Sequence, residues 1–445
     1  MKTPIADFVK EYANQEISRF HMPGHKGNAF LGCEHLDITE ILGADVLYSP
    51  DGIIAESEKN ATELFGSKHS YYSAEGSSLV IKAMLSLVAK KTPSGRRARI
   101  LAARNVHKAF IYACALLDLD ADFIYPEGAS HLCECNITPD SLKRALEAKN
   151  PLPDAFYITS PDYLGNIADV AGLSAVCREY GIPFLVDNAH GAYLAFTDPS
   201  MHPIMLGADM CCDSAHKTLP VLTGGAYLHI AKSYEANDDE VRSALALFAS
   251  TSPSYLILQS LDLCNAYLAD GYKQKLNGCL QKLSLLSERL ALLGFAPERA
   301  EQLKLVFSRQ SCGYSGNELA THLRAYKIEP EFADSDYTVL MITPETTDRD
   351  LERVYHAFSN LQKKTPLPAP LPPRFEIPAK ALSVREAVFS QSLNISVEDA
   401  EGRVCASPTV SCPPAVPVVM SGEIITRNSI EVMRYYGIEK IEVVK

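Results

Sequence analysis

The sequence predicts an α/β protein with a mostly parallel central sheet, followed by a small α+β domain and a small C-terminal domain. Three observations support this fold class. Short apolar runs alternate with helical patterns over residues 99–230, which is typical of a parallel sheet covered by helices on both faces. A different order of strands and helices follows over residues 303–362. The proline-rich segment 366–373 then marks the clearest domain boundary.

The expected elements of the large domain follow from hydrophobic spacing. Residues 1–18 and 57–66 show helical patterns, and a third, apolar helix follows Ser78. Another helix begins after Thr138, whose hydroxyl can cap it and which precedes a proline. Six apolar runs are expected to be strands, and they cover residues 99–103, 121–125, 155–159, 183–186, 210–213 and 225–230.

The later part of the chain contains a long amphipathic helix over residues 271–293. Beyond it we expect a strand, a helix, two short strands and a closing helix, of which the strand covers 304–308 and the two helices 317–326 and 348–361. The expected parts are an N-terminal arm with an active-site loop, a large domain, a small α+β domain, a linker and a C-terminal domain. Their ranges are 1–55, 56–270, 271–363, 364–378 and 379–445.

The composition is that of an ordinary globular protein of two to three domains. The chain has 445 residues, of which 47% are hydrophobic and 22% charged. It lacks an apolar run of membrane-spanning length, and its first residues lack the apolar core of a signal peptide. The formal net charge of −12 argues against binding to nucleic acid. We therefore expect a cytoplasmic protein with neither a nucleic-acid nor a membrane partner.

The twelve cysteines do not follow a metal-binding spacing. One residue separates Cys133 from Cys135, Cys211 and Cys212 are adjacent, and most of the others lie singly in apolar runs. We expect reduced, buried thiols and no metal site.

Two polar segments that follow expected strands carry the candidate catalytic residues. In Ser214-Ala-His-Lys217, a lysine at a strand end has a hydroxyl and an imidazole beside it, which suits a Schiff-base lysine. Taken alone, a surface lysine explains this segment more simply. The segment Asp187-Asn-Ala-His190 favours the Schiff-base lysine over the surface lysine, because Asp187 ends a buried strand, where ligands of open α/β sheets bind. Together the two segments resemble the paired signature of fold-type I pyridoxal-phosphate (PLP) enzymes, in which the aspartate pairs with the ring nitrogen.

Further motifs make the resemblance more specific. The cationic loop 19–27, with the sequence R-F-H-M-P-G-H-K-G, looks like the N-terminal signature of the ornithine/lysine/arginine decarboxylase family. Residues 104–108 (R-N-V-H-K), 160–165 (S-P-D-Y-L-G) and 250–255 (S-T-S-P-S-Y) are similar to later motifs of that family. The segment after the linker resembles the family's small C-terminal domain. The resemblance thus covers nearly the whole chain and implies a large domain of the fold-type I PLP-dependent transferase type.

The resemblance also implies which residues hold the cofactor. In the family the turn Gly76-Ser77-Ser78 cradles the PLP phosphate, although such a turn is often only a helix cap. Glu75 departs from the family pattern, which has a neutral residue there, and its charge would weaken phosphate binding unless it points away. His107 would stack on one face of the ring and Ala189 would pack on the other. The remaining candidates for cofactor binding are Asp187, His190, Ser214, His216, Lys217 and Thr251.

The implied activity is PLP-dependent decarboxylation of a small basic amino acid. Arginine, lysine or ornithine would yield CO₂ and the corresponding amine of the polyamine pathway. The catalytic residues would be Lys217, His216, Asp187 and His107, with either His216 or Lys217 returning a proton to Cα. Either of two loops, around Asp51 and Asp162, could hold the distal cation of the substrate.

In the family the segment Ser250–Ser254 reaches the phosphate of the neighbouring subunit, which implies a homodimer with shared active sites. Two alternatives to decarboxylation remain open. An aminotransferase or β-eliminating lyase of the same fold would use the same Asp187 and Lys217. A non-catalytic PLP-fold binding protein is also compatible with the sequence, because Glu75 points to weakened phosphate binding.

Overall fold

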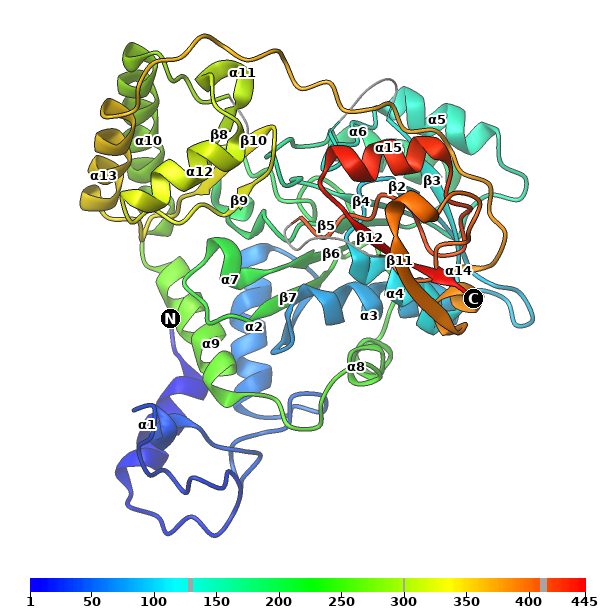
Figure 1. The fold of residues 1–445 in the computed structure, drawn as a ribbon. Coiled ribbons are helices and arrows are strands. Elements are labelled where there is room, and N and C mark those ends of the chain that lie inside the picture. The colour runs from blue at the N-terminus through cyan, green and yellow to red at the C-terminus, as the bar shows by residue number, and fades with distance from the viewer. Residues whose placement is uncertain (127–130, 299–300, 409–413) are drawn as a thin grey trace. The chain divides into compact units, whose positions relative to one another are not determined.

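The computed structural model describes residues 1–126, 131–298, 301–408 and 414–445, and it confirms the α/β class (Figure 1). Seven strands form the largest sheet, in the order β1-β7-β6-β5-β4-β2-β3. Its pairs β2–β3 and β5–β6 are parallel, whereas β7 runs antiparallel to both of its neighbours. A three-stranded sheet, β8-β10-β9, and a two-stranded sheet, β11-β12, are both antiparallel.

The chain divides into two compact units, of which the first comprises residues 1–98, 153–157 and 170–273. Strand β4 (Ala155–Thr159) begins in this unit and ends in the second one. The other elements of the first unit are α1 (Pro4–Asn14), η1 (Glu34–Leu36), α2 (Ile53–Phe65), β1 (His69–Ser73), α3 (Gly76–Lys91), α6 (Val170–Tyr180), β5 (Phe184–Asp187), η2 (Ala192–Phe196), β6 (Met210–Asp213), α7 (Ala215–Thr218), β7 (Ala226–Ile230), α8 (Asp238–Ala246) and α9 (Tyr255–Ala269).

The second unit comprises residues 99–152, 158–169 and 274–445. Helix α10 (Tyr272–Leu293) leads into its later part. Its other elements are β2 (Arg99–Ala103), α4 (Lys108–Leu117), β3 (Asp120–Ile124), α5 (Pro139–Glu147), β8 (Lys304–Ser308), α11 (Arg309–Cys312), α12 (Gly316–Ala325), β9 (Phe332–Ala333), β10 (Tyr337–Met341), α13 (Asp348–Ser359), α14 (Val384–Phe389), β11 (Ser392–Ser396), η3 (Val397–Asp399), α15 (Arg427–Tyr435) and β12 (Lys440–Val444).

The apolar runs located the expected strands well. Strands β2, β4, β6 and β8 have the predicted bounds, and β3, β5 and β7 differ from the prediction by one residue. Strand β1 was missed because its sequence, H-S-Y-Y-S, contains no apolar run. Buried hydroxyls take the place of apolar groups in this strand, and hydrogen bonds satisfy them. For example, Ser70 Oγ lies 2.8 Å from Ser67 Oγ and 2.7 Å from His229 Nδ1.

Most expected helices are present, with small shifts at their ends. Helix α2 begins four residues before its predicted start, and α10 begins one residue after it. The predicted cap of α5 is confirmed, since the Thr138 hydroxyl accepts from the Ser141 N–H at 3.1 Å. No helix among the described residues is long and apolar enough to cross a membrane. The eleven cysteines within the described ranges are free thiols, as expected, and Cys412 lies outside those ranges.

In the first unit, α1, α2 and α9 pack against one another through a shared carboxylate. Asp262 on α9 accepts the Ile5 and Ala6 N–H groups at 2.9 and 3.0 Å through one oxygen. Its other oxygen accepts the Ser57 hydroxyl of α2 at 2.5 Å. This arrangement satisfies backbone donors at the start of α1, which has no side-chain cap at its N-cap residue Thr3.

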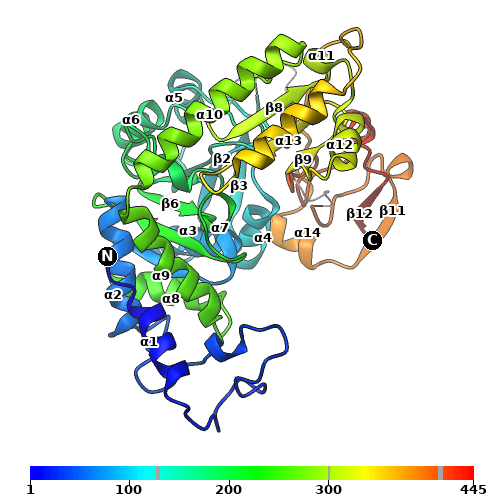
Figure 2. The ribbon, with the colours of Figure 1, turned by 90° about the vertical axis from the view of Figure 1, so that its left-hand side faces the viewer.

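In the second unit, α10 and α13 lie side by side along the sheet of β8, β9 and β10 (Figures 1 and 2). Ion pairs link the two helices, with Lys282 Nζ 2.6 Å from Asp348 Oδ1 and a second pair between Arg289 and Glu352. Residues 363–379, between α13 and the last part of the chain, form neither helix nor strand.

Arg104, at the end of β2, joins this strand to the last part of the chain. Its guanidinium group is buried and donates to the carbonyls of Pro417 and Val418 at 2.8 and 2.6 Å. It also lies within 6 Å of the ring centroids of Phe123, Tyr125 and Phe375. The Lys108 N–H donates to the Ala415 carbonyl at 2.9 Å. The loop between β2 and α4, which carries His107, is therefore held by residues 415–418.

Replacing Arg104 with methionine should lower the free energy of unfolding by about 2–4 kcal/mol, because it leaves two buried carbonyls without their charged donor. Arg385→Met is a matched control. Arg385 also donates to two carbonyls, but it is exposed, so its loss should cost less than about 1 kcal/mol. Urea unfolding followed by circular dichroism measures both. Equal losses for the two variants would contradict a special role for Arg104.

Candidate active site

Four segments of the first unit meet at one edge of the large sheet, which we call the carboxyl edge. Strands β5 and β6 are parallel and end there at Asp187 and Asp213. Strand β7 is antiparallel to β6 and begins there at Ala226, and β1 is antiparallel to β7 and ends there at Ser73. The strand directions thus bring together the polar residues that follow Ser73, Asp187 and Asp213.

Asp187 is buried, and only donors surround its carboxylate among the contacts described. The Tyr157 hydroxyl donates to Oδ2 at 3.2 Å, and the Ala189 N–H and the Cys212 thiol donate to Oδ1 at 3.2 and 3.3 Å. A carboxylate held in this way can pair with a protonated ring nitrogen.

Lys217 lies in α7, the single helical turn that follows β6. Its Nζ atom is 3.0 Å from Nε2 of His190, which follows β5. The two sequence motifs therefore meet through their last residues. An imidazole at this distance can accept a proton from an ammonium group and leave the amine nucleophilic.

His216 is oriented by the backbone at the start of β7. Its Nδ1 atom is 3.0 Å from the Gly225 carbonyl, which can only accept, so Nδ1 carries the ring proton of the neutral imidazole. Nε2 is then the ring atom that takes up or releases a proton.

The turn before α3 has the features of a phosphate site. Helix α3 has sixteen residues and no side-chain cap at its N-terminus among the described residues. Gly76 adopts a positive φ of 72° with open space at the position of a Cβ atom. The Ser77 and Ser214 hydroxyls lie 2.7 Å apart, so the turn and the lysine segment present their oxygens together. Backbone N–H groups at a helix start and adjacent hydroxyls suit an anion.

Glu75 is exposed and contacts the segment that precedes α9. Its Oε1 atom accepts the Ser250 N–H at 2.6 Å. This contact places the Ser250–Ser254 segment, which includes the candidate Thr251, beside the turn of the same protomer. Thr251 itself is exposed.

Asp213 is the centre of a buried cluster, the Asp213 cluster, which also contains Asn188, His202 and His229. Oδ1 accepts the Asn188 amide at 2.7 Å, and Oδ2 lies 3.0 and 3.1 Å from Nε2 of His202 and His229. Burial by itself would raise the pKa of Asp213, but the two imidazoles and their hydrogen bonds hold that pKa well below its usual range. Burial lowers the pKa of His229.

The Asp213 cluster joins the segment after β5 to the segment after β6. Asn188 belongs to the first segment, and Asp213 directly precedes Ser214. A Cβ atom on Gly191 would lie 2.0 Å from Asn188 Oδ1, so only glycine permits the turn in which Asn188 reaches Asp213. Asp213, His202 and His229 were not among the predicted site residues. A charged residue at the end of the apolar run 210–213 is the one signal that could have identified Asp213.

His107 and Asp162 belong to the second unit. His107 caps α4, where its Nδ1 atom accepts the Ala109 N–H at 3.1 Å. The Asp162 carboxylate accepts two hydrogen bonds from Asn166, at 2.9 and 2.8 Å, and burial raises its pKa to about 6. Asp51, the other candidate for the distal cation, is exposed in the first unit. The stacking role of His107 and the choice between Asp51 and Asp162 stay predictions.

The basic N-terminal loop is held by its own neighbours. Arg19 donates to the carbonyls of Glu34, His35 and Asp37, and His25 Nε2 lies 3.2 Å from Asp37 Oδ2. Phe20, by contrast, is 93% exposed.

Comparison with known proteins assigns nearly the whole chain. Residues 3–309 match the family model for the major domain of Orn/Lys/Arg decarboxylases, and residues 372–441 match the model for their C-terminal domain. An uncharacterized protein of Bacillus subtilis, YaaO, is 31% identical over 97% of this chain and 93% of its own length. An arginine decarboxylase of the same organism is 30% identical over 96% of this chain and 92% of its own length.

Among solved structures, the constitutive lysine decarboxylase of E. coli has a similar fold. The TM-score is 0.77 at 17% sequence identity, and the match covers 100% of this chain and 82% of that one. The predicted fold-type I class is thereby confirmed. The carboxyl edge fits the PLP cofactor of this fold, because it presents the groups that this cofactor requires. These groups are the uncapped start of α3, the Ser77–Ser214 hydroxyl pair, the Asp187 carboxylate and the Lys217 amine.

Asp213→Asn should lower the free energy of unfolding by about 2–4 kcal/mol at neutral pH, because an amide cannot accept from all the donors that face Asp213. The folded-state pKa of Asp213 lies below that of the unfolded chain. The stabilisation is therefore complete above about pH 4 and is lost as the pH falls further, so the two proteins should converge in acid.

The control is Asp209→Asn, which alters a half-buried carboxylate that accepts the Phe184 N–H and the Ser233 hydroxyl. It should cost less than about 1 kcal/mol. Urea unfolding at a series of pH values measures all three proteins. A loss for Asp213→Asn that did not vary with pH would show that the charge is unimportant.

Proposed function

Because the chain belongs to the Orn/Lys/Arg decarboxylase family, whose members are PLP-dependent amino-acid decarboxylases, we propose that it is a cytoplasmic enzyme that decarboxylates a basic amino acid. The products would be CO₂ and the corresponding amine. The observation that carries this proposal is the meeting of the Lys217 amine, the Asp187 carboxylate and the Ser77–Ser214 hydroxyls at one sheet edge. The match to the family's C-terminal domain favours decarboxylation over transamination or β-elimination.

Arginine is the substrate that we place first. Several relatives named arginine decarboxylase are 28–30% identical over 95–97% of this chain, whereas the matched lysine decarboxylases are 23–24% identical over 60% of it. Lysine and ornithine present the same α-amino and α-carboxylate groups to the site. Discrimination between them depends on the length of the side chain and on the groups that bind its cation.

Bound PLP supplies a carbonyl carbon that condenses with amines and a ring that accepts electrons. Lys217 would hold the cofactor through its Nζ atom, and His190 Nε2, 3.0 Å away, could take a proton from that amine. Asp187 would pair with the protonated ring nitrogen, and its own position is set by the Tyr157 hydroxyl and the Ala189 N–H.

Proton return to Cα belongs to His216 or Lys217, which lie in the same helical turn. The Gly225 carbonyl fixes Nδ1 of His216 as a donor and directs proton exchange to Nε2. Buried Asp187, Asn188, His190 and Ser214 surround these groups and exclude water from the strand ends.

The test of this function is CO₂ release from arginine, lysine, ornithine and neutral amino acids by the PLP-loaded protein. We expect release from one or more basic amino acids and none from neutral ones. Lys217→Ala should abolish both turnover and the cofactor adduct that borohydride traps, because it removes the attaching amine. Transamination products without CO₂ would replace the proposal with an aminotransferase.

Asp187→Asn should keep the fold and most of the PLP while lowering the rate by roughly two orders of magnitude or more, because the ring nitrogen loses its charged partner. Tyr157→Phe is the matched control. It removes one donor to the carboxylate and keeps the charge, so its rate should fall much less. Rate and cofactor content are measured separately. A near-parental rate for Asp187→Asn would mean that the carboxylate is only structural.

We also propose that two copies form a dimer in which Thr251 or Ser252 reaches the partner's cofactor phosphate. Large apolar side chains of the N-terminal arm support this proposal, because Phe20, Leu31 and Leu42 are 93%, 90% and 101% exposed. A second copy of the chain would cover such a surface.

Mixing two inactive proteins tests the shared site. In a hybrid of Lys217→Ala with the double variant Thr251→Val, Ser252→Ala, one site collects both defects and the other collects neither. Activity should return to at most about one quarter of the parental value, since half of randomly mixed dimers are hybrids with one good site each. Subunit exchange is verified with differently tagged chains. Exchange without recovered activity would place Thr251 and Ser252 in their own subunit's site or outside it.

A further inference from the structure

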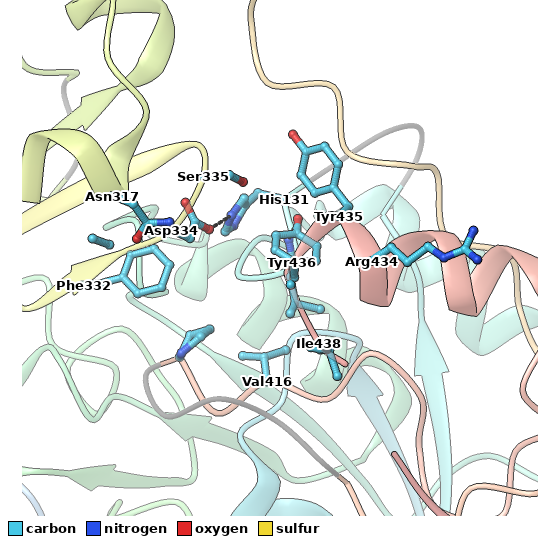
Figure 3. Close-up of a pocket in the computed structure, with 14 residues that line it drawn as sticks. His131, Asn317, Phe332, Asp334, Ser335, Val416, Arg434, Tyr435, Tyr436 and Ile438 are labelled. Atoms are coloured by element: carbon cyan, nitrogen blue, oxygen red, sulfur yellow. Dashed lines mark hydrogen bonds and ion pairs between the residues drawn. The ribbon is translucent and has the colours of Figure 1, made fainter. Parts of the chain in front are cut away.

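A cavity of about 280 Å³ lies within the second unit, between the small α+β domain and the C-terminal domain (Figure 3). One wall comes from β9 and the turn after it, which carry Phe332, Asp334 and Ser335. Another comes from the end of α15, where Tyr435 and Tyr436 lie. We call this cavity the Phe332 pocket. It shares none of its lining residues with the candidate active site.

The setting of the Asp334 carboxylate in the pocket depends on His131, which lies beside it (Figure 3). Nδ1 of His131 accepts the Cys133 N–H at 3.2 Å, so the ring proton is on Nε2 and is donated to Asp334 Oδ2 at 2.8 Å. A second proton, on Nδ1, would face that N–H group.

Asp334 is ionised in this setting. Its Oδ1 atom accepts the N–H groups of Asp336 and Tyr337, both at 2.8 Å. Burial by itself would raise the pKa of Asp334, but His131 and the backbone hydrogen bonds hold it below its ordinary value. Among the described residues, no lysine or arginine forms an ion pair with this carboxylate, whose one side-chain partner is His131.

The other charged side chains at or near the pocket already have partners. Arg434 Nε donates to Glu398 Oε1 at 2.6 Å, and its side chain points away from the other labelled residues (Figure 3). Asp336 accepts the Tyr435 hydroxyl at 2.8 Å and lies 3.4 Å from Arg309. Among the described residues that line the pocket, Asp334 is thus the carboxylate that has no lysine or arginine partner.

An inorganic cation fits the pocket poorly. His131, Asp334 and Asp336 each bring a potential ligand atom within 4.8 Å of the others. A metal ion on Nε2 would force the ring proton onto Nδ1, against the Cys133 N–H. The geometry of His131 thus opposes a metal site.

An organic cation fits better. The rings of Phe332, Tyr435 and Tyr436 line the pocket, and aromatic faces attract ammonium and guanidinium groups. The Ser335 side-chain oxygen, Oγ, is buried and has no hydrogen-bond partner among the described residues. It can therefore accept from an N–H donor next to Asp334.

We propose that the Phe332 pocket binds an alkylammonium or alkylguanidinium ion that lacks a carboxylate. This is the class of product that the proposed decarboxylation would release, and the biological identity of the ligand rests on that function. The corresponding amino acids should bind more weakly, because they bring a carboxylate into a pocket that contains Asp334, while the lining Arg434 already pairs with Glu398. A ligand here contacts both domains and stabilises their association.

A tryptophan in the pocket tests this proposal. The chain contains no tryptophan, so Ile438→Trp places the protein's single indole on the wall of the pocket. Titration of the PLP-loaded variant with 1,5-diaminopentane or 4-aminobutylguanidine should give a saturable change in indole emission. Lysine and arginine, which carry the same cations together with a carboxylate, should bind at least about tenfold more weakly.

Two substitutions test the role of charge in the Ile438→Trp protein. Asp334→Asn should weaken amine binding at least about tenfold. Asn317→Lys, at an exposed lining position, leaves the hydrogen bonds of Asp334 intact and places a tethered ammonium in the pocket, so it should weaken binding similarly. Asn317→Gln is its matched control and should bind as the parent does.

The outcomes separate this site from the active site. Equal binding of 1-pentanol, or no effect of either charge change, would overturn the proposal. An amine-dependent change in cofactor absorbance without an indole response would place amine binding at the active site alone and would also overturn it. An indole response from a protein that releases no CO₂ from any amino acid would support the pocket while contradicting the proposed function.

Discussion

The buried carboxylate of Asp213 is the constraint on which the candidate active site depends. It occupies the end of β6, and it must remain charged because an amide and two imidazoles donate to it. Through Asn188 it fixes the segment after β5, and through the chain itself it fixes the segment after β6. The distance between His190 and Lys217 follows from this double attachment. Neither the amide and the two imidazoles that bind Asp213 nor the Cys211 thiol, which also donates to it, is a candidate for contact with the cofactor, so the cluster acts by positioning.

The direction of the strands explains why so many polar groups share one edge. Two parallel strands end there, and the antiparallel pair β1–β7 adds the end of one strand and the beginning of another. The turn before α3 consequently meets the glycines before β7, where the Gly76 N–H donates to the Gly224 carbonyl at 2.7 Å. It meets the lysine segment where Ser77 Oγ lies 2.7 Å from Ser214 Oγ. A site built in this way obtains one group from each of several short loops, which suits a cofactor with separate phosphate, ring and carbonyl groups.

The C-terminal domain has a structural role that can be stated from contacts within the second unit. Residues 415–418 accept hydrogen bonds from Arg104 and Lys108, which flank the loop that carries His107. The same domain contributes one wall of the Phe332 pocket through α15.

The sequence by itself determined the fold class, most strand positions and the motifs that carry Asp187, Lys217 and the Gly76–Ser78 turn. These features are local: apolar runs mark buried strands, and the motifs occur in the family's order along the chain. Tertiary structure alone decided that the polar strand β1 is buried, that His202 and His229 bind Asp213, and that His131 donates to Asp334 in the Phe332 pocket. Such partners lie far apart in the sequence, and packing selects them through distances and hydrogen-bond directions that periodicity does not encode.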